Sequence, residues 1–111
     1  MNNSGNWNLT DVDSAQYIKQ LGDRLFDCIQ VNETPNGFVI VQAVVDLECY
    51  CSADIEEIAA MYCYSPDELP EDSLLAEMIF EVESYEATIS TAIYPTFEEA
   101  SKAVEEIVQS A

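Results

Sequence analysis

The amino-acid sequence predicts an α+β domain of two layers, in which helices cover one face of a small antiparallel sheet. Hydrophobic residues make up 49% of the 111 positions, which is enough for a packed core. They recur at helical spacing in some segments and at every second position in others. The predicted order of elements is α-β-α-β-β-α, with residues 1–9 as a flexible N-terminal segment and residues 10–111 as a single domain.

The first predicted helix follows the asparagine-rich N-terminal segment, in which Trp7 and Leu9 are candidate anchors. Thr10 and Asp13 have the spacing of a capping box. Apolar residues then recur at helical spacing as far as Cys28, namely Ile18, Leu21, Leu25 and Cys28. We therefore expect a helix over 10–30, followed by a turn over 32–37 that contains Asn-Gly.

Residues 38–51 fit two interpretations. Every second residue from Val39 to Cys51 is apolar, which indicates a strand. A single long helix that continues to Tyr62 would also align apolar residues along one face. The β-branched residues of 38–45 favour the strand. Ser52 is then expected to cap a short helix over 53–64.

The second half of the chain begins with a break at residues 64–72, which contain two prolines. Alternating apolar residues follow over 76–82 and, with the opposite parity, over 85–93. This change of parity predicts two strands joined by a hairpin at 83–86. Thr96 and Glu99 form a capping box for the last helix, whose buried face is expected to include Phe97, Ala100 and Val104.

The charge of the chain is extreme. It contains 22 acidic and 3 basic residues and no histidine, which gives a formal net charge of −19. Binding to phosphate groups depends on Lys and Arg, so nucleic acid and anionic membranes are excluded as direct partners. We expect the partner to be a basic protein surface. The alternative interpretation is that the acidity is an adaptation to a salty cytoplasm.

Little in the sequence supports catalysis or a bound cofactor. Histidine, the usual general base, is absent, and with so many carboxylates some close pairs are expected by chance. Asp11 and Asp13 begin like a calcium loop, but Gln16 and Gly22 stand where Gly and Glu are required. We therefore predict that the protein is not an enzyme and holds no cofactor or metal.

The four cysteines do not match a zinc-binding pattern, because their spacing is wrong. The favoured interpretation is free thiols that act as small core residues in a reducing compartment, and the alternative is a disulfide. The sequence has no apolar run long enough to span a membrane and no basic N-terminal leader. We therefore expect a cytoplasmic protein.

Two acidic surfaces are candidates for binding a partner. On the predicted strands, carboxylates at positions i and i+2 would stand about 6.6 Å apart and form a lattice opposite the helices. Exposed tyrosines beside this lattice would suit arginine side chains, which stack on aromatic rings. The first surface comprises Asp46, Glu48, Glu77, Glu81, Glu83 and Glu86 with Tyr64 and Tyr85. The second surface comprises Glu56, Glu57, Asp67, Glu68, Glu71 and Asp72.

In size, charge and lack of catalytic groups, the chain resembles the small acidic inhibitors that phages and mobile elements encode. The resemblance implies a monomeric or homodimeric inhibitor that mimics nucleic-acid charge. Such an inhibitor would act in the host cytoplasm on a nuclease or defence complex, in the manner of anti-CRISPR or anti-restriction proteins. The alternatives are an immunity or antitoxin protein for a basic nuclease toxin and an acidic secretion chaperone. A chaperone would need an exposed apolar groove and self-association.

Overall fold

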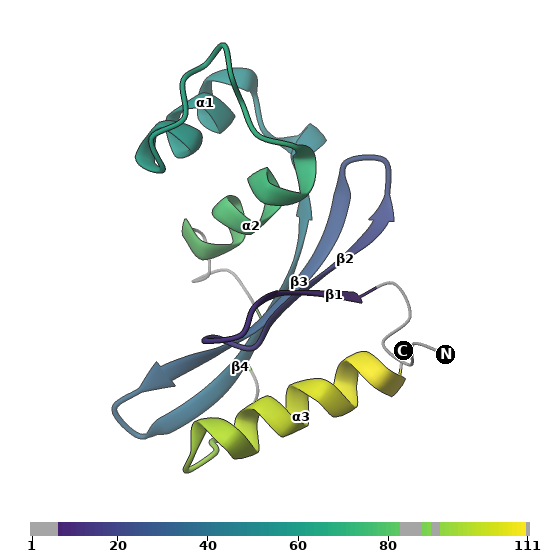
Figure 1. Ribbon diagram of the computed structural model, residues 1–111, viewed down its shortest axis with the longest axis vertical. Coiled ribbons are helices and arrows are strands. Elements are labelled where there is room, and N and C mark those ends of the chain that lie inside the picture. Colours follow the sequence, from purple (N-terminus) through teal and green to yellow (C-terminus); the bar gives the residue numbers. More distant parts are fainter. Residues whose placement is uncertain (1–6, 83–87, 90–91, 111) are drawn as a thin grey trace.

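The computed structural model describes residues 7–82, 88–89 and 92–110 and shows an α+β domain that begins with strands. Figure 1 shows the arrangement of the elements. The strands are β1 (Trp7–Asp11), β2 (Gln16–Gly22), β3 (Leu25–Thr34), β4 (Gly37–Asp46) and β5 (Thr88–Ile89). The helices are the 3-10 helix η1 (Leu47–Cys49), α1 (Ser52–Met61), α2 (Asp72–Val82) and α3 (Phe97–Ser110). The α+β class is confirmed, and the predicted order of elements is wrong.

The sheet is a meander in which each strand pairs antiparallel with the next, in the order β1-β2-β3-β4-β5. The helix predicted over 10–30 is therefore wrong, because this segment contains the end of β1, all of β2 and the first part of β3. Residues 7–9, expected to be loose, belong to β1, and Trp7 is buried as an anchor. The turn between β2 and β3 lies at Asp23 and Arg24, directly after Gly22.

Two buried glutamines explain why the alternation of β2 and β3 is hard to recognise. Gln16 and Gln30 occupy positions where a half-buried strand usually carries apolar residues. The Gln16 side-chain amide donates to Oε1 of Gln30 at 3.2 Å, and the Gln30 amide donates to Oδ1 of Asn32 at 2.7 Å. This row of amides satisfies the buried polar groups, so the strands tolerate polar residues on an inner face.

The hairpin from β3 to β4 turns at Pro35 and Asn36, within the predicted turn. Gly37 follows with φ of +138°, and a Cβ there would lie 2.7 Å from the carbonyl oxygen of Tyr94. Only glycine combines this backbone conformation with so close a neighbour. The predicted strand over 38–51 is confirmed as far as Asp46, and η1 begins at the next residue, Leu47.

Helices cover both faces of the sheet, which corrects the predicted two-layer arrangement. Phe26, Cys28 and Val41 face a core that includes residues of α1 and α2. The alternate residues Ile29 and Ile40 face a second core with α3. The hairpin of β3 and β4 is long enough that α1 and α2 occupy one end of the molecule and α3 the other (Figure 1).

Residues 76–82 form most of α2, so the strand predicted there is wrong. The helix contacts β2, β3 and β4 on one side and α1 on another. Apolar residues therefore surround most of it, and only a narrow face remains for charged side chains. This burial removes the one-sided pattern by which an amphipathic helix is recognised.

The helix predicted over 53–64 is present as α1, which ends earlier, at Met61. The prediction that Ser52 caps it is wrong, because Ser52 is its first residue and the N-cap is Cys51, whose side chain makes no capping hydrogen bond.

The connection after α1 and the start of α3 agree with prediction. The non-helical connection from Tyr64 to Glu71 contains both prolines of the predicted break. At the start of α3, the backbone N–H of Glu99 donates to Oγ1 of Thr96 at 3.2 Å, which is one of the two hydrogen bonds of the predicted capping box. Ala100, Val104 and Val108 are buried on the inner face of this helix.

The four cysteines are free thiols. Cys28 is a buried core residue, as predicted, and burial together with the charges of Asp27 and Glu77 raises the pKa of its thiol to about 12. Cys49, Cys51 and Cys63 are exposed, so the prediction that they pack in the core is wrong.

Among the helices that the described residues form, none is both long and apolar enough to cross a membrane.

Candidate partner-binding surface

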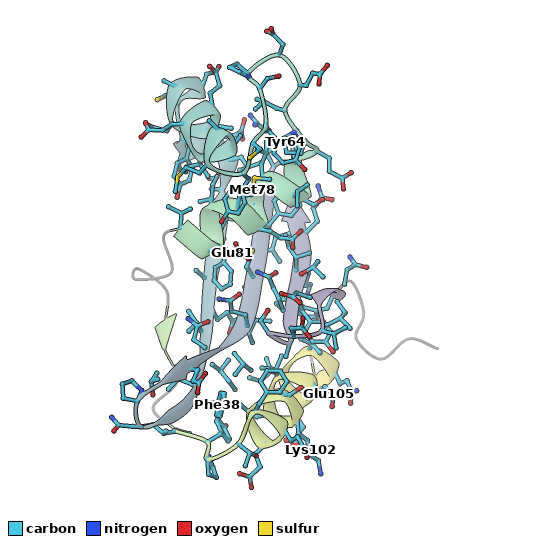
Figure 2. The ribbon with its side chains drawn as sticks, turned by 60° about the vertical axis from the view of Figure 1, so that its left-hand side comes forward. Phe38, Tyr64, Met78, Glu81, Lys102 and Glu105 are labelled. Atoms are coloured by element: carbon cyan, nitrogen blue, oxygen red, sulfur yellow. The ribbon has the colours of Figure 1, made fainter. Side chains whose placement is uncertain are left out.

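Residues 46–82 form a continuous acidic end of the molecule, which we call the acid lobe. The lobe contains η1, α1, the connection after it, and α2. It carries 11 of the 22 acidic residues and no lysine or arginine. Figure 2 shows the lobe projecting from the sheet at the end opposite α3. Half of the acidic residues therefore belong to one projecting part of the surface.

Most residues of the first predicted surface do not share a sheet face. Asp46 ends β4 and caps η1, where its side chain accepts a hydrogen bond from the backbone N–H of Glu48 at 3.0 Å. Glu77 and Glu81 lie on α2. The predicted lattice of strand carboxylates is therefore wrong for these residues, because a helix replaces the strand that was to carry them. Glu83, Tyr85 and Glu86 lie outside the described residues.

The second predicted surface lies within the acid lobe. Glu56 and Glu57 are on α1, and Asp72 begins α2. Three exposed carboxylates lie on the connection between these helices, namely Asp67, Glu68 and Glu71. Arg24 approaches Asp72 from the turn between β2 and β3, with 3.5 Å between Nε and Oδ2. Both side chains are well exposed, so this ion pair contributes little stability.

Two tyrosines are positioned by the way in which α1 ends. Tyr62 is its C-cap residue, and Cys63 follows in the left-handed conformation with φ of +69°. The N–H groups of Cys63 and Tyr64 then donate to the carbonyl oxygens of Ala60 and Ala59, at 3.0 and 3.1 Å. These paired bonds form a Schellman motif, which reverses the chain sharply. Both tyrosines are thereby turned toward α2.

Tyr62 and Tyr64 line a hollow of about 280 Å³ together with one face of α2. The residues of α2 have the spacing i, i+3, i+4 and i+7, namely Leu74, Glu77, Met78 and Glu81. The Tyr62 hydroxyl donates to Oε2 of Glu81 across the opening at 2.8 Å. Figure 2 shows Tyr64, Met78 and Glu81 together on this side of the lobe. We call this hollow the tyrosine–glutamate pocket.

The electrostatics of the pocket favour positive charge. Burial, followed by the nearby charges of Glu81, Asp11 and Glu71, raises the pKa of Glu77, although a hydrogen bond from Thr10 opposes the shift. Burial, the hydrogen bond to Glu81 and the charge of Glu81 together raise the pKa of Tyr62 to about 12. Burial is the largest cause of both shifts, and the neighbouring carboxylates add to it, with no basic residue of the lobe to balance them.

Sequence reasoning found part of this pocket. Glu77, Glu81 and Tyr64 were candidates for binding a partner, whereas Tyr62, Leu74 and Met78 were not. The signal that identifies the set is the helical spacing of residues 74, 77, 78 and 81, which is visible only once α2 is recognised as a helix.

Within residues 7–82, 88–89 and 92–110, no three or more Cys, Asp or Glu side chains form a group that could hold a metal ion. Comparison of the chain with family models, with curated proteins and with solved structures found no match.

Proposed function

We propose that this protein is a small acidic inhibitor that occupies the DNA- or RNA-binding site of a nuclease or defence complex by mimicking nucleic-acid charge. The observation that supports the proposal is the acid lobe, with 11 acidic residues and no basic residue in 37 positions. A positively charged cleft shaped for phosphates attracts such a surface and accelerates its association.

The fold supports the proposal because the helices that carry many of these charges are packed against the sheet. Ile55 and Ala59 of α1 and several residues of α2 are buried in the same core as the sheet. The helical carboxylates are therefore held on packed elements, so little backbone freedom remains to be lost on binding.

The test is a competition assay with labelled duplex DNA and a panel of purified guide-loaded CRISPR effectors, restriction enzymes and repair nucleases. We expect the protein to displace DNA from at least one of them, with an affinity that falls steeply as salt increases. If the protein and DNA bind together on the same partner, or if no member of the panel binds it, the proposal is contradicted.

The same assay distinguishes an immunity protein. Such a protein would bind one cognate toxin nuclease tightly and leave every other DNA-binding protein of the panel unaffected. A charge mimic would displace DNA from every protein of the panel whose DNA-binding cleft can accommodate the acid lobe.

A further inference from the structure

We propose that the tyrosine–glutamate pocket receives the side chain of one arginine of the basic partner. This inference rests on the proposed function for the existence of such a partner, and it adds the chemical group that the lobe recognises. The pocket would make the interaction specific, because exposed carboxylates alone attract any basic surface.

The size and lining of the pocket fit a single side chain. Its volume of about 280 Å³ lies just below the roughly 300–1,000 Å³ typical of small-molecule sites. Leu74, Met78 and the two tyrosine rings provide an apolar wall for an aliphatic stem. The carboxylates of Glu77 and Glu81 line the same space and are available to a cationic head group.

Arginine fits this lining better than lysine. Its guanidinium group is planar and weakly hydrated, it stacks on aromatic rings, and it donates two parallel hydrogen bonds to a carboxylate. Glu81 already accepts from Tyr62 through Oε2, which fixes the orientation of its carboxylate group. Glu77 is half-buried beside other acids, so an incoming cation would relieve an unbalanced charge.

The test uses a probe in place of the unidentified partner. Acetyl-arginine-amide is titrated into the isotope-labelled protein and followed by NMR, with acetyl-lysine-amide as the comparison. We expect saturable shifts confined to Tyr62, Tyr64, Glu77 and Glu81 and weaker binding of the lysine probe. Glu81→Gln keeps an acceptor for the Tyr62 hydroxyl and should bind the arginine probe roughly tenfold more weakly.

The matched control is Glu57→Gln, which removes the same charge from an exposed position on α1. It should leave the affinity for the arginine probe unchanged. The inference is overturned if both probes bind equally well, if the shifts spread over the whole lobe, or if the two variants weaken binding equally.

This experiment separates the two proposals. A pocket that binds the arginine probe while no nucleic-acid-binding protein is displaced would contradict the proposed function alone. Displacement of DNA by a protein whose pocket ignores the arginine probe would contradict the pocket alone.

Discussion

At the scale of single residues, the hydrogen bond from Tyr62 to Glu81 connects the end of α1 with the exposed face of α2. It joins two elements of the acid lobe that are separated by the proline-containing connection. Because a carboxylate accepts this bond, the bond favours the neutral phenol and opposes its ionisation.

The first prediction concerns that phenol. Glu81→Gln should lower the pKa of Tyr62 from about 12 toward the ordinary tyrosine value, because the acceptor loses its charge. Alkaline titration with ring-labelled tyrosine, followed by NMR, measures the change, and Tyr62→Phe identifies the signal. An unaltered pKa would show that the hydrogen bond does not form in solution.

The second prediction concerns the raised pKa of Glu77. Between the ordinary glutamate pKa and the raised one, the folded protein holds a proton that the unfolded chain has released. Stability therefore falls as pH rises through this window, and the loss is complete above the folded-state pKa. Urea unfolding should show Glu77→Gln to be more stable than the wild type at neutral pH.

The advantage of Glu77→Gln should shrink as the pH falls below the ordinary glutamate pKa, where the wild-type side chain is protonated in both states. Glu57→Gln on α1 serves as the control for general charge reduction. Equal stabilisation by the two substitutions would show that the effect belongs to net charge and not to Glu77.

At the scale of elements, the Schellman motif at the end of α1 shapes the tyrosine–glutamate pocket. The same motif holds one residue, Cys63, in an unfavourable backbone conformation. Cys63 occupies the left-handed position at which glycine is the usual residue. A side chain in that conformation costs about 1–2 kcal/mol.

The third prediction is that Cys63→Gly stabilises the protein by about 0.5–1 kcal/mol, because the relief of strain is partly offset by greater freedom of the unfolded chain. Urea unfolding measures the gain. Cys63→Ala is the control, since it removes the thiol but keeps the β-carbon, and it should give no such gain. If alanine stabilised as much as glycine, the thiol and not the backbone would be responsible.

The elements that sequence reasoning predicted correctly are those whose signals are local. The cap at Thr96, the two prolines and the alternation of β4 each act within a few residues. Elements whose pattern depends on tertiary contacts were missed. Gln16 and Gln30 are polar inside the fold because they satisfy one another, and α2 is apolar on most sides because it lies between the sheet and α1.

For the candidate site too, one part could be predicted from the sequence and another part could not. The acidity of residues 46–82 is a property of composition and is evident from the sequence. The pocket is not evident, because it requires the chain reversal at Cys63 to bring two tyrosines against α2. The predicted strand carboxylates failed for the same reason, since they depended on the assignment of one segment as strand.

At the scale of the whole molecule, the net charge acts over distances comparable to the protein itself. The principal extents are 42 × 37 × 21 Å. The Debye length is about 30 Å at 0.01 M ionic strength and about 8 Å at physiological ionic strength. Carboxylates of the acid lobe and of α3 therefore repel one another at low salt and are screened from one another at physiological salt.

The fourth prediction follows from this screening. The midpoint of thermal unfolding should rise by several degrees as sodium chloride is increased from low to physiological concentration. The chloride salt is used because sulfate would also stabilise the fold by strengthening the burial of apolar surface, which is a mechanism separate from charge screening. A midpoint that falls over this range would contradict the view that repulsion limits the stability of this fold.

The measurement that tests the central claim most directly compares two variants of equal net charge in the DNA-competition assay. One variant carries Glu57→Gln, Asp67→Asn and Glu68→Gln in the acid lobe. The other carries Glu98→Gln, Glu105→Gln and Glu106→Gln on α3. All six residues are exposed.

If the acid lobe replaces nucleic acid on the partner, the lobe variant should compete up to about 100-fold less well, since each exposed pair contributes at most about 1 kcal/mol. The α3 variant should compete nearly as well as the wild type. Equal losses in the two variants would show that net charge alone attracts the partner, and a loss confined to the α3 variant would place the binding surface at the opposite end of the molecule.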